Sequence, residues 1–313
     1  MKGLELSKKY YLEFGKPMLE RSFADPLPHI AVGLVGSGSE CLGFDDEIST
    51  DHDFEPGFCI FLPDESIVDR KTEFALERAY AKLPNEFLGF RRSPVSPVGG
   101  NRHGVIRMSE FFMKTTGHPN GELDIFDWLS IDEQALLEAT SGEIFYDGSG
   151  CFSEIRQKLS YLPENVRLKK LAGHILNMAQ AGQYNYQRCL SRDDTAAAQL
   201  AIFEFVKSAL RVIFLINKKY IPYYKWSFRA LRELPTLSSL HDPLEFLISS
   251  ANSEDNANIK NETIRSICNE ILMVLEKESL LHLEGDDLEA YAYEINSKIS
   301  EERIRNMHIL CAI

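Results

Sequence analysis

The chain has 313 residues, and its 47 Asp and Glu residues outnumber its 34 Lys and Arg residues, which gives a formal net charge of −13. This length suits two domains, each able to bury its own core. Such an acidic protein is a poor candidate for binding duplex nucleic acid, because phosphate attraction needs a basic surface, but it can still hold a nucleotide through a metal ion.

The cysteine pattern and the apolar segments indicate a cytoplasmic protein. Six cysteines are scattered without a C-x-x-C pair, so neither a zinc site nor a disulfide framework is expected. The first fifteen residues lack the apolar core of a signal peptide. The most apolar stretch, 196–216, is interrupted by charged residues and has helical spacing, so we expect a core helix and no membrane partner.

The first half of the chain alternates apolar runs of strand length with helical segments. The runs are 29–36, 57–63 and 103–109. Between the second and third runs, a helix is expected to start at Ser66, with Asp69 as its capping-box partner, and to end at Pro84. Strands that alternate with helices indicate an α/β unit.

Strand signals disappear near residue 150, and the rest of the chain has helical periodicity. Helices are expected over about 152–161, 164–182, 194–219, 242–251, 262–278 and 286–309. The polar stretch 251–261 is expected to be a loop. We therefore predict an α+β protein, with an α/β domain built on a mixed sheet over 1–150 and an all-helical bundle domain over 151–313.

The segment VGLVGSGSECLGFDDEISTDHDF (32–54) combines a cramped Gly-Ser turn with a run of acidic residues. A strand that ends in Gly36-Ser37-Gly38-Ser39 lets successive backbone N–H groups converge, and such a nest binds anions, phosphate above all. On this feature alone, a tight turn without a ligand is the simpler explanation.

Asp51 and Asp53 give the acidic run a more specific meaning. On an extended segment their side chains would point to the same face, with Cα atoms about 7 Å apart. Two carboxylates held this close together suit a hard cation such as Mg²⁺. The alternatives are a solvated acidic turn or a calcium loop, but the calcium-loop spacing requires glycine where Pro56 stands.

Gly36-Ser37 followed by Asp51-x-Asp53 resembles the signature of the nucleotidyltransferase superfamily, which has the polymerase-beta-like fold. In that superfamily a strand ends in Gly-Ser and a pair of acids follows. The whole stretch also resembles a bacterial domain-of-unknown-function family placed in the superfamily, as do RLKKLAGHILNMAQAGQYNYQRCL (167–190) and YIPYYKWSFRAL (220–231). The resemblance implies a nucleotidyltransferase-fold domain followed by a helical domain that forms the far wall of the cleft.

The roles of the superfamily's motif residues transfer to this chain position by position. The loop from Gly36 to Ser39 would hold the phosphates of a nucleoside triphosphate, and Asp51 and Asp53 would bind Mg²⁺ or Mn²⁺. The metal ion would bridge the triphosphate during in-line attack at the α-phosphorus. The implied activity is transfer of a nucleoside monophosphate from a triphosphate to a small-molecule or protein acceptor.

Catalytic members of the superfamily carry a third carboxylate on a later strand, and the expected strand 103–109 contains no acid. Glu110 lies just beyond that run, and Asp124 belongs either to a short strand of its own or, more simply, to the start of a helix. If the third carboxylate is missing, the alternative is a nucleotide-binding sensor or partner-binding protein that keeps the phosphate nest and the metal pair without turnover.

Aromatic and basic residues gather at two places in the helical half and in one loop of the first half. The candidate acceptor-binding residues are Tyr184, Tyr186, Arg188, Tyr224, Lys225, Trp226 and Arg229. Their rings suit stacking on a base or a ring-shaped acceptor, but packing in the bundle core explains them equally well. Arg102, in the loop 91–104, would either close over a triphosphate or be an exposed charge. The oligomeric state stays open, a homodimer included.

Overall fold

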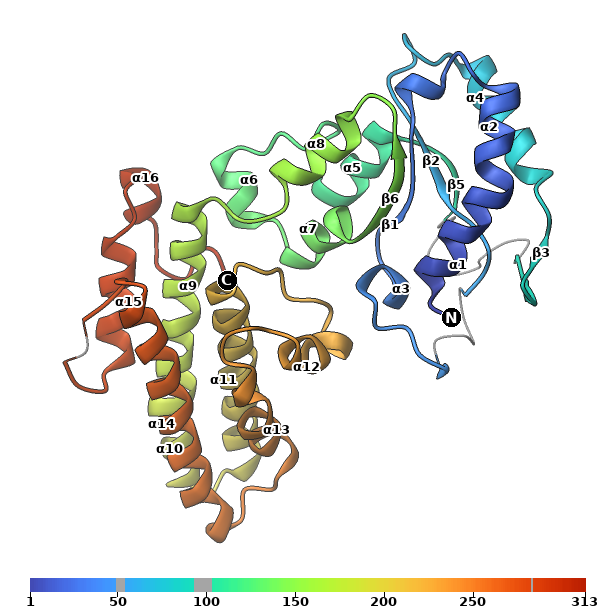
Figure 1. The fold of residues 1–313 in the computed structure, drawn as a ribbon. Coiled ribbons are helices and arrows are strands. Elements are labelled where there is room, and N and C mark those ends of the chain that lie inside the picture. The colour runs from blue at the N-terminus through green and yellow to red at the C-terminus, as the bar shows by residue number, and fades with distance from the viewer. Residues whose placement is uncertain (49–53, 93–102, 283) are drawn as a thin grey trace. The chain divides into compact units, whose positions relative to one another are not determined.

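The computed structural model describes residues 1–48, 54–92, 103–282 and 284–313, and the chain divides into two compact units (Figure 1). The first unit comprises residues 1–123 and 134–160, and the second comprises 124–133 and 161–313. The predicted domain boundary at residue 150 falls inside the first unit, just before the helix that follows the last strand. Each unit has a core of its own.

The first unit is built on a mixed sheet, which within the described residues has four strands in the order β5-β2-β1-β6. These strands are β1 (Ala31–Val35), β2 (Cys59–Leu62), β5 (Gly104–Arg107) and β6 (Gly142–Asp147). β1 runs antiparallel to both β2 and β6, whereas β5 runs parallel to β2. The predicted mixed sheet is confirmed, and β6 is a strand that the sequence analysis does not predict.

Helices cover both faces of this sheet (Figure 1). One face carries α1 (Gly3–Tyr10), α2 (Lys16–Ser22) and α4 (Arg70–Ala81), and the other carries α5 (Met108–Thr116) and α8 (Cys151–Lys158). Side chains alternate along β2, so Ile60 packs into the core with Tyr10, whereas Phe61 stacks on Phe152 with ring centroids 4.2 Å apart. β2 is apolar throughout because both of its faces are buried.

Shorter elements connect these layers. They are η1 (Tyr11–Gly15), η2 (Leu27–His29), α3 (Ser39–Leu42), the hairpin of β3 (Glu86–Phe87) with β4 (Phe90–Arg91), and α7 (Glu133–Thr140). The π-helical turn η1 joins α1 to α2 without a break in the helical backbone. None of these N-terminal helices is predicted by the alternating pattern of the sequence.

The start of α4 differs from the prediction. The N-cap is Asp69, whose side chain accepts a hydrogen bond from the Thr72 amide at 2.8 Å. Ser66 lies in the preceding turn, where its amide donates to the Asp64 carboxylate at 2.9 Å. The prediction of a start at Ser66 is wrong because Asp64 closes a turn first, and the helix can begin only after it.

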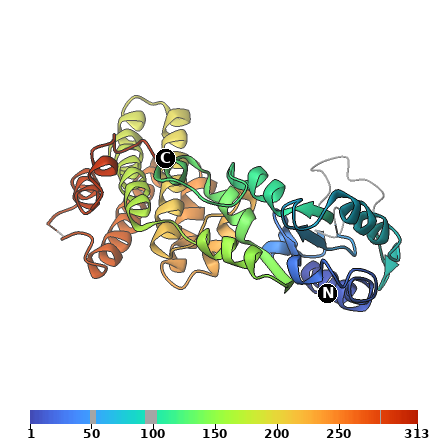
Figure 2. The same ribbon diagram turned by 90° about the horizontal axis from the view of Figure 1, so that it is seen from above.

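The second unit is a helical bundle around two long helices, α9 (Glu164–Met178) and α11 (Thr195–Ile216). α9 continues through the π-helical turn η4 (Ala179–Asn185) into α10 (Tyr186–Leu190). The other helices are α6 (Ile125–Ser130), α12 (Tyr224–Arg232), η5 (Ser238–Leu240), α13 (His241–Ser249), α14 (Glu254–Lys277), α15 (Leu288–Ser297) and α16 (Glu302–Arg305). α15, drawn in red, lies along the yellow-green α9 (Figures 1 and 2). The predicted helical bundle is confirmed.

Two predicted boundaries in this bundle are wrong. The expected loop 251–261 is helical from Glu254 onwards, because Ser253 caps α14 and Lys260 is buried with three acceptors for its ammonium group: Gln199 Oε1 at 3.1 Å, the Ser250 carbonyl at 2.7 Å and Asn252 Oδ1 at 2.9 Å. The expected helix 286–309 is interrupted after α15, where Ser300 donates from its amide and its hydroxyl to Asn165.

The apolar stretch 196–216 forms most of α11, as expected for a core helix. Ile202, Phe205 and Ile213 on this helix are fully buried. Throughout the described part of the chain, no helix combines the length and the apolar character needed to cross a bilayer.

A buried arginine joins β5 to α4 and the loop before it. Arg107 donates from Nη1 to the carbonyls of Pro63 at 2.7 Å and Val68 at 2.8 Å, and from Nη2 to the Glu73 carboxylate at 2.6 Å. Its side chain is 7% exposed, whereas Arg70, which also approaches Glu73, is 70% exposed. The fold therefore offers one buried and one exposed arginine on the same carboxylate.

We expect Arg107→Met to destabilise the first unit by about 3–5 kcal/mol, because it leaves a buried carboxylate and two carbonyls without their donor. The matched control Arg70→Met should cost about 0–1 kcal/mol, as exposed ion pairs do. Hydrogen exchange at the β2 amides measures the opening free energy of this unit. Equal losses in the two variants would show that Arg107 does not hold β5 to α4.

Candidate functional site

The ends of four strands meet at one edge of the sheet, which we call the loop edge. Gly33 pairs with Cys59, Cys59 pairs with Gly104, and Val35 pairs with Gly142. Because β1 is antiparallel to β2 and β6, and β5 is parallel to β2, the end of β1 lies beside the starts of the other three strands. The chain leaves β1 at this edge through the loop 36–39.

The loop 36–39 has the backbone of a glycine-dependent turn. Gly36 has φ +112°, and Gly38 has φ +136° and ψ 150°, a region that residues with a side chain rarely adopt. α3 begins at the last residue of this loop, Ser39, and ends at Leu42, with Gly43 as its C-cap. The Glu40 carboxylate lies over Gly38, within 2.5 Å of where a Cβ would stand. The sequence analysis predicted a cramped turn here, and the structure has one.

Two residues far along the chain hold this loop. The Ser141 hydroxyl donates to the Gly36 carbonyl at 2.7 Å, across 105 residues of sequence. Arg156 on α8 in turn donates to the Ser141 carbonyl at 2.7 Å and to the Ala139 carbonyl at 3.2 Å. The sequence analysis missed both residues, since neither belongs to a recognisable motif.

A histidine and a glutamate are paired at the loop edge. His103 Nδ1 lies 3.2 Å from Glu55 Oε1, and both side chains are largely buried. The imidazole packs on Gly57, where a Cβ would come within 2.6 Å of the ring. A histidine oriented by a carboxylate is a common proton acceptor in enzymes. Glu55 is a residue that the sequence analysis missed, although it stands two positions after Asp53.

The acidic run 45–53 is only partly described. Asp45 is buried, accepts from the Gly3 amide at 2.7 Å and pairs with Lys2 at 3.3 Å, so it anchors the start of α1. The candidate metal ligands Asp51 and Asp53 lie outside the described residues, and so does Arg102. Phe54, directly after Asp53 in sequence, packs on Phe90 with ring centroids 4.8 Å apart.

Of the two candidates for the third carboxylate, Glu110 lies away from the loop edge and Asp124 caps a helix. Glu110 lies in the first turn of α5, which follows the far end of β5, so it is at the opposite edge of the sheet. Asp124 is the N-cap of α6, where its carboxylate accepts from the amides of Phe126 at 2.7 Å and Asp127 at 2.9 Å. Asp124 therefore stands at the start of a helix, the simpler of the two alternatives, and this residue belongs to the second unit.

The candidate acceptor-binding residues divide into core and surface. Tyr186 is fully buried, and its hydroxyl donates to Asn252 Oδ1 at 3.2 Å. The prediction that Tyr186 contacts the acceptor is therefore wrong, and the residue belongs to the core of the bundle. Tyr184 is exposed, and the Arg188 guanidinium lies 4.6 Å from its ring centre. Sequence reasoning left both outcomes open because ring type alone does not distinguish packing from binding.

The aromatic residues at the start of α12 form an exposed group. Tyr224 is 74% exposed, and its ring contacts that of Tyr223 at a tilt of 43°, with ring centroids 4.2 Å apart. Lys225 Nζ lies 4.9 Å and the Arg229 guanidinium 5.7 Å from the Trp226 ring. We call these five residues the α12 aromatic group. The sequence analysis did not predict a helix here.

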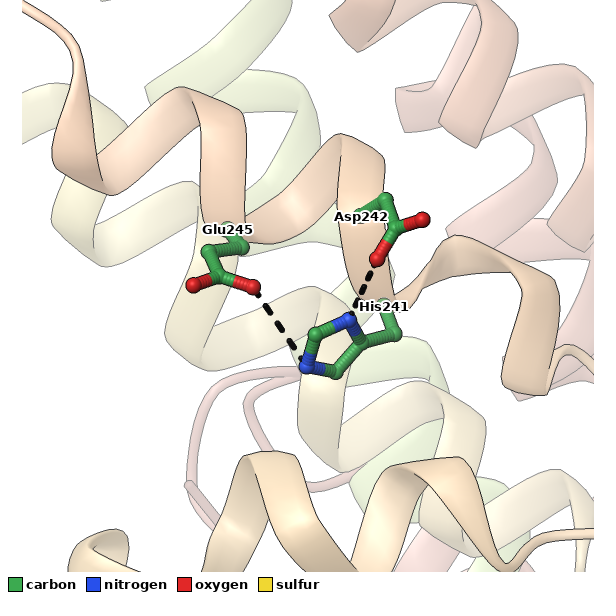
Figure 3. A group of neighbouring side chains, drawn as sticks. All are labelled: His241, Asp242 and Glu245. Atoms are coloured by element: carbon green, nitrogen blue, oxygen red, sulfur yellow. Dashed lines mark hydrogen bonds and ion pairs between the residues drawn. The ribbon is translucent and has the colours of Figure 1, made fainter.

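In the described part of the chain, one group of three possible metal ligands occurs, His241, Asp242 and Glu245 at the start of α13 (Figure 3). Asp242 faces the imidazole Nδ1 at 2.7 Å, whereas Glu245 faces Nε2 at 3.5 Å. One ion bound to Nε2 would have Glu245 as its other protein ligand, fewer than the three or four of zinc sites. Arg232, 4.0 Å from Glu245, further disfavours a cation. We assign the group as a histidine ring held between two carboxylates.

Comparisons with known proteins add little beyond the fold. A family model described as a domain of unknown function (DUF4037) matches residues 128–227, less than half of the chain and outside the loop 36–39. Among solved structures, a nucleotidyltransferase-like protein from Exiguobacterium sibiricum 255-15 is similar at 10% sequence identity and a TM-score of 0.36, over 94% of this chain and 81% of that chain. This similarity carries no argument about activity. The comparison with curated proteins gave no match.

We expect Gly38→Ala to destabilise the first unit by about 1–3 kcal/mol, because its backbone lies in a region that is nearly exclusive to glycine. Gly43→Ala is the matched control: Gly43 has φ 74° and ψ 11° with open space around it, so its loss should be about 1 kcal/mol. Urea denaturation compares the two variants. If Gly38→Ala were neutral, the loop would not have this conformation in solution.

Proposed function

We propose that this protein is a metal-dependent nucleotidyltransferase that transfers a nucleoside monophosphate from a nucleoside triphosphate to an acceptor. The observation that carries the proposal is the glycine-turned loop 36–39 at the end of β1, beside the start of β2. The Asp51-x-Asp53 motif precedes β2 by a few residues in sequence. The resemblance of this motif to the nucleotidyltransferase signature supports the same assignment.

The phosphates of the nucleotide are proposed to contact the backbone of the loop 36–39. Gly36 suits this role because no atom outside its immediate neighbours lies within 4 Å of where its Cβ would stand. The Ser141 hydroxyl holds the loop through the Gly36 carbonyl, and Arg156 in turn holds Ser141. The carboxylates of Asp51 and Asp53 fit a hard cation, Mg²⁺ or Mn²⁺, as its oxygen ligands. The bound ion would neutralise the charge that develops on the triphosphate.

His103 is our candidate for taking the proton of the attacking hydroxyl. It lies at the loop edge, and Glu55 orients its ring through Nδ1, so Nε2 would be the proton acceptor. The pair would replace the third carboxylate, since β5 carries no acid and Glu110 lies at the other edge. Glu55 acts through His103 and is therefore a positioning residue.

The acceptor is proposed to be a small molecule that contacts the α12 aromatic group. Tyr224 and Trp226 offer ring faces, and Lys225 and Arg229 add positive charge beside them. Tyr184 with Arg188 is a second exposed aromatic and basic pair that suits the same chemistry. The proposal does not include Tyr186, whose ring is buried.

A second function is favoured by one observation. No acid stands on β5 (104–107), where the superfamily carries its third carboxylate. This favours a nucleotide-binding protein without turnover, in which the loop 36–39 and the aspartate pair sense a nucleotide. Pyrophosphate release from ATP or GTP in the presence of Mg²⁺ and candidate acceptors distinguishes the two functions.

We expect Asp51→Asn and Asp53→Asn each to abolish Mg²⁺-dependent binding of ATP or GTP, because each removes a charged oxygen ligand. Thermal stability in EDTA should stay the same or rise, since the mutation relieves repulsion between like charges. Asp46→Asn, a nearby acid outside the motif, is the control and should bind normally. Isothermal titration and thermal denaturation report both effects. A variant that unfolds in EDTA would show a structural role for the acids.

We expect His103→Asn to reduce pyrophosphate release about 10²- to 10⁴-fold, the usual contribution of a general base. The dissociation constant of the nucleotide should change little, because the phosphates bind elsewhere. Glu55→Gln should shift the pH profile of turnover more than its maximum, since Glu55 only orients the ring. His29→Asn, at the far end of β1, is the control. Full activity of His103→Asn would exclude His103 as the base.

A further inference from the structure

The second unit contains a polar pocket of about 570 Å³ that the proposed function does not use. Ligand sites for small molecules typically have about 300–1,000 Å³. The pocket is lined by the end of α6 and the residues after it (129–133), by α9, by α11 and by residues 311–313, all within the second unit. Its acidic and basic lining residues are Asp132 and Glu133, Lys170 and His174 on α9, and Glu204, Lys207 and Arg211 on α11.

Glu133 is the unusual member of this lining. The residue is 1% exposed, and neither carboxylate oxygen has a hydrogen-bond partner in the described part of the chain. Arg211 Nη1 is the nearest cationic donor, 3.7 Å from Oε1, which is beyond hydrogen-bonding distance. The backbone N–H of Ile221 also lies near the carboxylate and lowers its pKa. A buried carboxylate normally has several donors, so Glu133 has unused acceptor capacity.

Two cations and a neutral histidine surround this carboxylate. Lys170 is buried, and its ammonium has the Ala312 carbonyl as an acceptor at 3.3 Å. His174, one helical turn further along α9, is buried with its Nδ1 unpartnered. Burial, together with the charges of Arg211, Lys170 and Lys207, lowers the pKa of His174 to about 3, so the ring is neutral. Burial also raises the pKa of Glu133, which Lys170 and Arg211 oppose.

The charges at the bottom of the pocket select the ligand's chemistry. A ligand with only an anionic group would find Lys170 and Arg211 but would meet the Glu133 carboxylate and leave it without a donor. A ligand with only a cationic group would meet the two cations. A metal ion is disfavoured for the same reason, because it would lie beside the positive charges of Lys170 and Arg211. A molecule that carries both signs satisfies both sets of groups.

We propose that this pocket binds a small zwitterion of about dipeptide size, with its ammonium group at Glu133 and its carboxylate at Lys170 and Arg211. The neutral His174 and the Ser208 hydroxyl, which line the same pocket, contribute uncharged hydrogen bonds to the rest of the molecule. Lys207 and Glu204 pair with each other at 3.3 Å near the rim and are more exposed. The proposal rests on no part of the proposed function, since every group involved belongs to the second unit.

Three probes with one skeleton test the proposal on the full chain. Glycylglycine carries both charges, N-acetylglycylglycine lacks the ammonium group, and glycylglycinamide lacks the carboxylate. Isothermal titration and thermal denaturation measure the binding of each probe. We expect glycylglycine to bind at least about tenfold more tightly than either derivative, because each loses one charge-assisted hydrogen-bonding group.

Glu133→Gln provides the second arm and is close in shape to the wild type. The variant should weaken the binding of glycylglycine about tenfold. Its affinity for N-acetylglycylglycine should be unchanged or higher, because the side chain no longer repels an anion. Arg211→Gln should weaken the binding of glycylglycine and of N-acetylglycylglycine, which carry a carboxylate, but not the binding of glycylglycinamide, which lacks one. The controls are Glu289→Gln and Lys277→Gln, which change the same charges at exposed positions of the second unit.

Two outcomes would overturn the proposal. One is a wild type that does not distinguish glycylglycine from its two derivatives, including the case in which none of them binds. The other is unchanged discrimination among the probes in Glu133→Gln. In both cases the group of charges would be a hydrated ion network that serves the fold. Because the probes vary the ligand, a variant that fails to fold does not affect the first comparison.

Discussion

The pairing of β1 with β2 is the constraint on which the first unit depends. The two strands are antiparallel and β5 is parallel to β2, so the end of β1 meets the starts of β2 and β5 at one edge of the sheet. The glycine-turned loop 36–39 and the Glu55–His103 pair are brought together in this way. The register of this pairing matters as much as its direction. A slip by one residue would exchange Ile60 and Phe61 between the cores on the two faces of the sheet.

Buried charges in this protein fall into two kinds. Arg107, Lys169 and Lys260 each direct their charged group at three protein acceptors, and each joins segments that are distant in sequence. Glu133 is buried as deeply, yet among the described residues its carboxylate oxygens have no hydrogen-bond partner. The first kind holds the fold together, and we infer that the second kind has capacity for a ligand.

The two units offer different chemistry to their ligands. The loop edge of the first unit has a backbone shaped by glycines and, in the adjoining sequence, acids that suit a cation, which together suit phosphate and metal. The pocket of the second unit has fixed side-chain charges of both signs, which suit a small molecule that is itself charged at two ends. The pocket proposal depends on groups of the second unit alone, so it does not require a particular arrangement of the two units.

The sequence by itself determined the α+β class, the change to a helical bundle, the core helix over 196–216 and the cramped turn at Gly36–Ser39. These features depend on local periodicity and on glycine's backbone freedom, which can be seen in neighbouring residues. The resemblance that points to a nucleotidyltransferase also depends on local spacing, from Gly36 to Asp53. Local rules were less reliable where two residues compete, as Ser66 and Asp69 do for the start of α4.

Only the tertiary structure decided which side chains meet. Ser141 reaches Gly36 across 105 residues, and His103 reaches Glu55 across 48, so no window along the sequence contains either pair. Burial of Tyr186, exposure of Tyr224 and the position of Glu110 at the far edge depend on how helices pack and on which way β5 runs. The unpartnered carboxylate of Glu133 is decided in the same way, because the absence of a donor is a property of the packed neighbours and not of the residue.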